Sequence, residues 1–478
     1  MLVFNKNTIK DKIYACWLGK NIGGTMGTPF EGRTELNDIQ GFSTPENVVL
    51  ANDDLDLQLV WLRAIEDYGP YSLNEQILGE YWISYIPPHW NEYGIGKNNM
   101  RAGLLPPMSG EYENPWKHSN GAWIRTEVWA CMAPGCPDIA IKYARMDASV
   151  DHGAGEGTYA AIFVAAIEAA AFVIHDLREL IDIGLSKIPA DCRMARSINL
   201  LLDCYDKGID WKETRRILVE DSADLGWFQA PANVAFSMLG LLYGEGDFKK
   251  SMILAINCGD DTDCTGATLG SIFGILNGTA GIPEDWKRHI GDNIVSVAID
   301  KGSLYGLPAT CTQLTDRVYN MIPVMLKANR AAAYLGDEDK FDDADIARFK
   351  DPWVARGLVA IPGMSYTTDF IWADCRVIFP DGPDIAPEKS VKVKLVVTNK
   401  NAGPKHLNLK WHLPEGFTVS NVRRDYVLQS GSRYTQPVLE IDATITAGSN
   451  VEACNRVICE ITAAGRPTAG LAQIVLIG

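Results

Sequence analysis

A row of glycines at every fourth position is the feature that most restricts the fold of this chain. Within "CGDDTDCTGATLGSIFGILNG", residues 258–278, glycines occupy positions 266, 270, 274 and 278. A helix places residues four apart on one face, and a face without side chains lets a neighbouring helix come close. Most of the larger side chains between them are apolar: Leu269, Ile272, Phe273, Ile275 and Leu276. We therefore predict a buried, tightly packed helix in a helical domain.

Three carboxylates stand directly ahead of this helix. Asp260, Asp261 and Asp263 fall within four positions. One aspartate at a helix start can accept hydrogen bonds from free backbone N–H groups. Three such charges repel one another unless something positive lies between them. Capping alone is therefore a poor account of the cluster.

A second polar cluster stands ahead of another amphipathic segment, "ANDDLDLQLVWLRAIEDY". It contains Asn52, Asp53 and Asp54. Taken singly, each cluster is explained as a helix cap. Taken together, two helix starts carrying oxygen ligands predict a site for hard divalent cations such as Mg²⁺ or Mn²⁺. A lysine or arginine between the carboxylates would argue against the cations.

Composition limits the partners of the chain. Its 478 residues carry 60 acidic and 44 basic side chains, a net charge of -16, which argues against a general binder of nucleic acid or anionic membranes. The start lacks a secretory signal, and the longest apolar run contains Glu168 and is too short to cross a bilayer. The 11 cysteines are scattered. We expect a soluble, cytoplasmic protein with reduced thiols and no membrane or nucleic-acid partner; the oligomeric state stays open.

The spacing of apolar residues changes towards the C-terminus. Helical spacing dominates up to about residue 345, whereas segments such as "KSVKVKLVVTNKN" and "VICEITA" alternate apolar and polar residues. We predict a mainly α protein: a helical domain over 1–345, a linker over 346–369, and an antiparallel β-sandwich over 370–478. The sandwich either covers an apolar face of the helical domain or binds sugar.

Residues 81–129 interrupt the helical pattern. Helical periodicity fails there, and the segment is dense in Trp, Tyr, Pro and Gly. Long irregular segments inside compact domains are often functional loops, and exposed aromatic rings stack well on sugar faces. The alternative is a well-packed surface loop.

Five segments, taken in order, resemble the motifs of the ADP-ribosylglycohydrolases, the family that includes the dinitrogenase reductase-activating glycohydrolase. They are "WLGKNIGGTMGTPFEG", "NDDLDLQL", "NGAWIR", "VDHGAGEGTYAA" and "GDDTDCTGAT". The resemblance covers roughly residues 9–330. In the tail, "HLPEGFTVSNV" resembles β-sandwich modules appended to bacterial glycosidases.

The resemblance implies an orthogonal all-α bundle with two Mg²⁺ or Mn²⁺ ions that hold the ribose hydroxyls of an ADP-ribosyl group and the attacking water. The implied metal ligands are Asn52, Asp53, Asp54, Asp261, Asp263 and Cys264. The implied catalytic residues are Glu31, matching an acid/base glutamate, and Asp261. The implied substrate-binding residues are Asn120, Gly121, Arg125 and His152. The expected substrate is an ADP-ribosyl or other glycosyl group on a small molecule or a modified protein. From the residues alone, Glu31 is equally a solvated loop carboxylate, His152 a capping or core histidine, and Arg125 the partner of a surface acid.

The chain also departs from the family pattern. Asn52 and Cys264 replace threonines, Gly24 replaces an aspartate, and Asp151 stands where threonine is usual before the histidine. A thiol is a soft ligand that suits Mg²⁺ poorly, although Thr265 stands one residue on. The alternative function is therefore a catalytically degenerate member that binds a ligand or serves a structural role.

Overall fold

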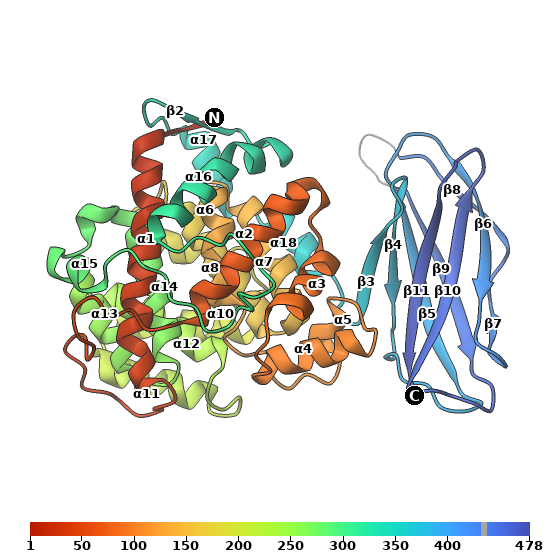
Figure 1. The fold of residues 1–478 in the computed structure, drawn as a ribbon, viewed down its shortest axis with the longest axis horizontal. Coiled ribbons are helices and arrows are strands. Elements are labelled where there is room, and N and C mark those ends of the chain that lie inside the picture. The colour runs from red at the N-terminus through yellow and green to blue at the C-terminus, as the bar shows by residue number, and fades with distance from the viewer. Residues whose placement is uncertain (432–436) are drawn as a thin grey trace.

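The computed structural model describes residues 1–431 and 437–478 and has two parts, a helical body and a pair of β-sheets (Figure 1). The longer helices of the body are α1 (Lys6–Gly27), α2 (Asp53–Ser72), α3 (Glu75–Tyr85), α4 (Asn91–Arg101), α7 (Pro137–His152), α8 (Glu156–Ala170), α9 (Leu177–Leu185), α10 (Arg193–Asp206), α11 (Trp211–Ser222), α12 (Ala230–Tyr243), α13 (Phe248–Asn257), α14 (Thr262–Asn277) and α16 (Cys311–Ala328). The shorter ones are α5 (Met108–Glu111), α6 (Glu127–Met132), α15 (Glu284–Ile290), α17 (Asp343–Ile346) and α18 (Trp353–Val359), with 3₁₀ turns η1 (Thr28–Phe30), η2 (Trp123–Arg125), η3 (Thr279–Gly281) and η4 (Ala347–Lys350).

Helix α14 lies at the centre of the body and packs against α1 along a seam of small residues. The glycine row predicts a close approach by a neighbouring helix, and the structure shows that this helix is α1: a Cβ atom on Gly270 would meet the carbonyl group of Gly19, and one on Gly266 would lie 2.9 Å from the carbonyl oxygen of Gly23. The seam runs to the N-terminal end of α14, where Gly27 of α1 lies against the backbone of Thr262. The start of α14 is therefore held close to the end of α1.

The C-terminal part consists of two antiparallel sheets, as the alternating sequence predicts. One has the order β11 (Ala469–Ile477), β10 (Cys454–Ala463), β6 (Lys405–His412) and β8 (Asp425–Leu428). The other has the order β3 (Ser365–Asp369), β4 (Ala373–Ile378), β5 (Ser390–Asn399), β9 (Val438–Thr446) and β7 (Thr418–Ser420). Both sheets send alternate residues into one hydrophobic cluster, for example Val393 and Leu395 of β5 and Val457 and Cys459 of β10. This arrangement is a sandwich.

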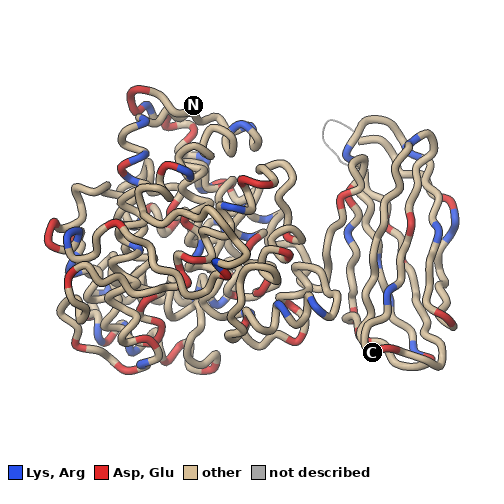
Figure 2. Tube along the Cα trace, in the orientation of Figure 1, with Lys and Arg blue, Asp and Glu red and all other residues tan. Residues whose placement is uncertain are grey.

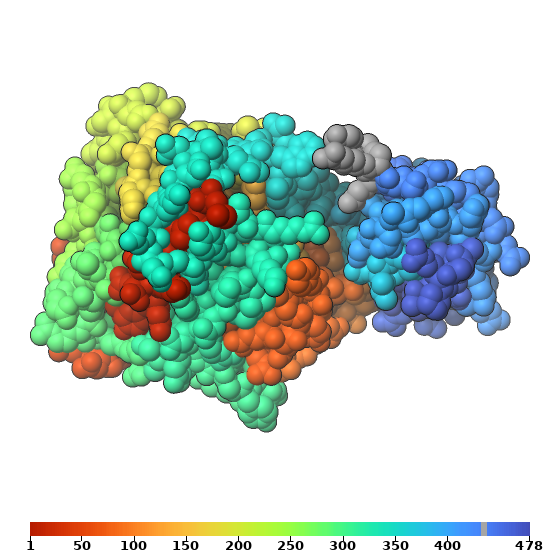
Figure 3. Space-filling model, turned by 90° about the horizontal axis from the view of Figure 1, so that it is seen from above, coloured from red at the N-terminus to blue at the C-terminus, as the bar shows by residue number. Residues whose placement is uncertain are grey.

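The helical body contributes to the core of the sandwich. Leu104 and Met108 are buried in the same hydrophobic cluster as the inner faces of the sheets. The Tyr112 hydroxyl donates a hydrogen bond to Asp384 Oδ1 at 2.5 Å, and Gln76 Nε2 donates one to the Thr367 carbonyl oxygen at 3.0 Å. The sandwich thus forms one end of an elongated molecule (Figure 3).

Two features differ from expectation. Residues 81–129 are not one long irregular loop, because they contain the end of α3, all of α4, α5 and η2, and the start of α6. The Pro-Pro pairs at 87–88 and 106–107 separate α3 from α4 and α4 from α5, and so the helical period never runs long enough to be seen in the sequence. The body is also not purely helical: β1 (Leu2–Asn5) pairs in parallel with β2 (Ala333–Gly336).

The range predicted as a linker, residues 346–369, contains regular structure. Strand β3 and helix α18 lie within it.

Among the residues that the structure describes, no helix combines the length and the apolar character needed to cross a membrane. Acidic and basic residues are interspersed along the trace of both parts (Figure 2).

Candidate active site

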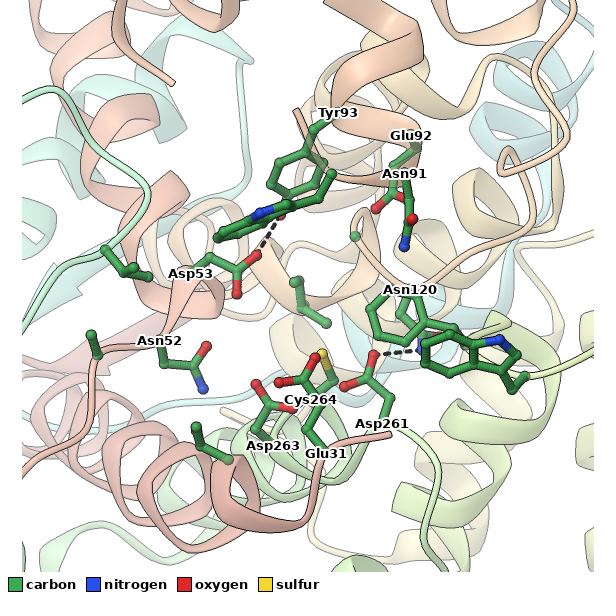
Figure 4. A pocket seen from close by; sticks show the side chains of 18 of the residues that line it. Glu31, Asn52, Asp53, Asn91, Glu92, Tyr93, Asn120, Asp261, Asp263 and Cys264 are labelled. Atoms are coloured by element: carbon green, nitrogen blue, oxygen red, sulfur yellow. Dashed lines mark hydrogen bonds between the residues drawn. The ribbon is translucent and has the colours of Figure 1, made fainter. Parts of the chain in front are cut away.

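The two acidic clusters meet at one cavity of about 500 Å³ in the helical body (Figure 4). Helices α2 and α14 begin at its wall, and the chain leaving α1 through η1 brings Glu31 to the same place. The cavity is lined by Thr28, Glu31, Ala51, Asn52, Asp53, His89, Trp90, Asn91, Glu92, Tyr93, Asn120, Gly121, Ile124, Trp227, Phe228, Asp261, Asp263, Cys264 and Val297. Residues far apart in the sequence therefore share one site.

The carboxylates of this wall lie close enough to share a cation. Oxygens of Glu31, Asp261 and Asp263 lie within 4.8 Å of one another, and so do ligand atoms of Asp54, Asp263 and Cys264. One oxygen each of Asp54, Asp261 and Asp263 is buried without a hydrogen-bond partner among the described residues. A buried carboxylate oxygen without a partner is costly, and a bound cation would supply the missing interaction. The residues present therefore fit a divalent ion bound by oxygen ligands.

Asp261 does not cap the helix that follows it. No backbone N–H of α14 bonds to its side chain. Its Oδ2 instead accepts a hydrogen bond of 2.7 Å from Asn120 Nδ2. The side-chain oxygen of Asn120, Oδ1, in turn accepts one of 3.0 Å from Trp123 Nε1. The capping explanation fails for this aspartate, because its carboxylate is aimed into the cavity (Figure 4).

Asp260 serves another purpose. Its backbone has a positive φ of 67°, which turns the residue away from its neighbour, and its Oδ1 accepts a hydrogen bond of 2.9 Å from the Phe228 N–H. The three like charges of the sequence are thus separated: two face the cavity, and the third fixes the loop that carries Trp227 and Phe228.

A lysine does lie near the cluster, but behind it. Lys20 Nζ is 3.9 Å from Asp54 Oδ2 and 2.7 Å from Glu127 Oε1, and it donates to the Ile124 carbonyl oxygen. Lys20 is buried and does not line the cavity. Lys20 therefore pairs with Glu127 and Asp54 from behind the cavity and does not stand between the carboxylates that line it.

Burial and the neighbouring negative charges raise the pKa values of the acidic residues. The charge of Asp263 raises the pKa of Glu31 to about 8, and burial raises the pKa of Asp53 to about 6. Burial also raises the pKa values of Asp54 and Asp261 well above the ordinary range. In each case the protein disfavours the charged form in the absence of a cation.

The two residues that replace threonines make contacts of their own. Asn52 Oδ1 accepts a hydrogen bond of 2.8 Å from the Asp54 N–H, as the cap of α2, and a Cβ atom on residue 24 would collide with its Nδ2. The departures at 24 and 52 are therefore coupled, because the asparagine fills the space that the glycine leaves. Cys264 Sγ donates to Asp54 Oδ1 at 3.4 Å, and burial keeps its thiol pKa well above the ordinary value. The Thr265 hydroxyl bonds to the Thr262 carbonyl and does not line the cavity.

The four residues expected to bind substrate divide into two pairs. Asn120 and Gly121 line the cavity, whereas Arg125 and His152 are buried behind it. Arg125 donates to the Gly121 carbonyl oxygen and is paired with Asp147 at 2.9 Å and Asp151 at 2.7 Å. The alternative interpretation of Arg125 as the partner of a surface acid does not hold, because both of its acidic partners are buried. Its position supports the loop that contacts the cavity.

The opposite wall comes from residues that sequence reasoning did not assign. The turn into α4 supplies His89 to Tyr93, and Tyr93 donates a hydrogen bond of 2.8 Å to Asp53 Oδ2. The density of aromatic residues in 81–129 was the available signal, but most of those rings do not face the cavity: Trp82, Trp123 and Trp129 are fully buried. Trp90, 47% exposed, and Trp227, 50% exposed, are the tryptophans at the cavity.

Comparison with known proteins identifies the family. The sequence profile of the ADP-ribosylglycohydrolases matches residues 5–322, more than half of the chain. The chain belongs to the ADP-ribosylglycohydrolase family. The resemblance of the five motifs is thereby confirmed, and so is the predicted class of a helical ADP-ribosylglycohydrolase domain followed by antiparallel sheets.

Individual relatives are distant. An uncharacterized protein of Archaeoglobus fulgidus is 22% identical over 298 residues, which is 59% of this chain and 93% of the relative. The solved structure of an ADP-ribosylglycohydrolase-related protein complex aligns with 67% of this chain and 99% of that structure's chain, at 19% identity and a TM-score of 0.43. The solved structure of a FixG-related protein from Vibrio parahaemolyticus aligns with 23% of this chain and 97% of that structure's chain, at 16% identity and a TM-score of 0.19. The family assignment rests on the profile alone.

Proposed function

We propose that this ADP-ribosylglycohydrolase family member is a divalent-cation-dependent glycohydrolase that hydrolyses the glycosidic bond of an ADP-ribosyl or related ribosyl or glycosyl group. One observation carries the proposal: beside a cavity of about 500 Å³, Asp54, Asp261 and Asp263 each have a buried oxygen with no hydrogen-bond partner among the residues that the structure describes. A structural cluster of acids would have satisfied those oxygens within the protein.

The expected ligands of Mg²⁺ or Mn²⁺ are Asp53, Asp54, Asp261 and Asp263, with the Asn52 carbonyl as a further candidate. Such ions, when bound, lower the pKa of a water molecule and neutralise charge on substrate hydroxyls. The Cys264 thiol is a poor ligand for these hard ions, and its contact with Asp54 suits a hydrogen-bond donor that orients the carboxylate. We propose one well-formed cation site and a weaker second one.

Glu31 is proposed as the base that takes the proton of the attacking water. It lines the cavity, and its carboxylate lies with those of Asp261 and Asp263. The hydrogen bond from Asn120 keeps the Asp261 carboxylate turned towards the cavity, and Asn233 Oδ1 accepts a hydrogen bond of 3.2 Å from the Asp261 N–H. Cleavage passes through an oxocarbenium-like state, which this negative wall stabilises.

The test compares two neighbouring aspartates in the full chain. Asp261→Asn removes a charge that faces the cavity, and we expect it to abolish Mn²⁺ binding in calorimetry and hydrolysis of ADP-ribosylated substrates. Asp260→Asn is the matched control, because its side chain can still accept the Phe228 N–H and does not line the cavity. Full activity of Asp261→Asn would refute the mechanism.

A second candidate function follows from Asn52 and Cys264, which replace hydroxyl ligands at the cavity. In that case the chain binds cation and ADP-ribose without cleaving a bond. Titration with Mg²⁺, Mn²⁺ and ADP-ribose, followed by assays over a panel of ADP-ribosylated and glycoside substrates, separates the two. Binding without hydrolysis across the panel favours the second function.

A further inference from the structure

Glu92 is a buried carboxylic acid on the wall of the cavity opposite the acidic cluster. It is the second residue of α4, lines the cavity, and is only 2% exposed. Its Oε2 is buried without a hydrogen-bond partner among the described residues. In Figure 4 it lies across the cavity from Glu31, Asp261 and Asp263. The site therefore has carboxyl groups on two sides of the space that a substrate would occupy.

The position of Glu92 is fixed by the loop that touches the acidic cluster. A Cβ atom on residue 121 would collide with Glu92 Oε1, so the glycine lets the Glu92 carboxyl group lie directly against this loop. The preceding residue, Asn120, bonds to Asp261. One short loop thus contacts both carboxyl groups, and it sets Glu92 and Asp261 in a defined relation to each other.

The groups behind Glu92 leave it an unneutralised acid. Ligand atoms of Glu92, Asp151 and His152 lie within 4.8 Å of one another. His152 Nδ1 lies 2.9 Å from Asp151 Oδ1, and its Nε2 lies 3.1 Å from the Ser119 hydroxyl. A cation has no place here, because Arg125 already provides a positive charge 2.7 Å from Asp151.

Charge balance favours a proton in this group. Arg125 is paired with Asp151 and with Asp147, at 2.9 Å, so with His152 neutral these groups carry one negative charge in excess, to which an ionised Glu92 would add another. Burial accordingly raises the pKa of Glu92. A proton held on the cavity wall, away from the cation site, is what a general acid requires.

We propose that Glu92 donates the proton to the leaving group in glycosidic bond cleavage, an inference that rests on the proposed function. The bond between the anomeric carbon and the leaving oxygen breaks, its electron pair goes to that oxygen, and the oxygen takes the Glu92 proton. Water forms the new bond to the anomeric carbon and gives its proton to Glu31. Solvent then returns a proton to Glu92 and removes one from Glu31, so that the reaction consumes one water. Paired carboxyl groups flanking the scissile bond are how glycosidases divide this work.

The test uses two aryl glycosides of ADP-ribose that differ in the leaving group, phenol or para-nitrophenol. Phenol needs protonation to depart, whereas para-nitrophenol departs readily without it. We expect Glu92→Gln to lower kcat for the phenyl substrate by about a hundredfold or more, and to change kcat for the para-nitrophenyl substrate little. A purely structural role would lower both rates together, and that result, or no loss on either substrate, overturns the proposal.

The control is Glu168→Gln. Glu168 is also fully buried, and one of its oxygens has no hydrogen-bond partner in the described part of the chain, but it does not line the cavity. We expect it to keep the wild-type ratio of the two rates. If Glu92→Gln does not fold, the wild-type chain itself decides: similar kcat values for the two substrates support acid catalysis, and a strong preference for para-nitrophenol overturns it. A wild-type chain that cleaves neither substrate with Mn²⁺ refutes the proposed function, and the role of Glu92 with it, whereas an active chain with an unselective Glu92→Gln refutes the role of Glu92 alone.

Discussion

The seam between α1 and α14 predicts a specific cost for a single methyl group. In Gly270→Ala the added Cβ would meet the carbonyl group of Gly19, with the carbonyl carbon 2.6 Å away and Met252 Cε 3.1 Å away. The methionine can move, but the Gly19 contact is backbone, so α1 as a whole must shift. Overpacking of this kind costs about 1–3 kcal/mol, and alanine returns about 0.9 kcal/mol through its better helix propensity. With the clash against backbone, we expect the free energy of unfolding to fall by about 1–2 kcal/mol.

Thermal unfolding measures this effect. A loss of that size lowers the melting temperature by about 1–3 °C in a domain as large as this helical body, because the entropy of unfolding grows with chain length. Gly357→Ala is the matched control: it lies on the exposed face of α18, and a Cβ atom there meets nothing within 4 Å. The control should be neutral or slightly stabilising. If Gly270→Ala melts at or above the wild-type temperature while the control behaves as expected, the close approach of the two helices is not what holds the start of α14 in place.

Two further predictions concern the cavity. Because burial raises the pKa values of Asp53, Asp54 and Asp261, the metal-free fold binds more protons than the unfolded chain. Its free energy of unfolding therefore falls as the pH rises from the ordinary aspartate range through the value of about 6 for Asp53. Saturating Mn²⁺ should remove this pH dependence of the free energy of unfolding, and its binding should release protons. Calorimetry in buffers of different ionisation enthalpy measures the proton release. Binding of Mn²⁺ with no proton release would contradict the prediction. Separately, Trp90→Ala should weaken ADP-ribose binding by about 1 kcal/mol, about fivefold in Kd, without changing the melting temperature, whereas unchanged affinity would show that the ring does not contact the ligand.

The sequence by itself determined the elements whose cause is local. Glycines at every fourth position specify a helix face that another helix can approach, and alternating apolar residues after about 370 specify the sheets. Oxygen-rich starts at 52–54 and 260–263 predicted where a cation site would form, since such residues belong at helix N-termini and near hard ions. These patterns were readable because each needs only residues that are neighbours along the chain.

Tertiary structure alone decided which of those residues face the cavity. The positive φ of Asp260 turns its carboxylate away, and Asn120, from a distant segment, holds that of Asp261 in place. The coupling of Gly24 to Asn52, and the arrival of Glu92 opposite the acidic cluster, likewise depend on contacts between segments remote in sequence. A side chain's chemistry is set by its own residue type, but its direction and its partners are set by whatever the rest of the chain packs against it.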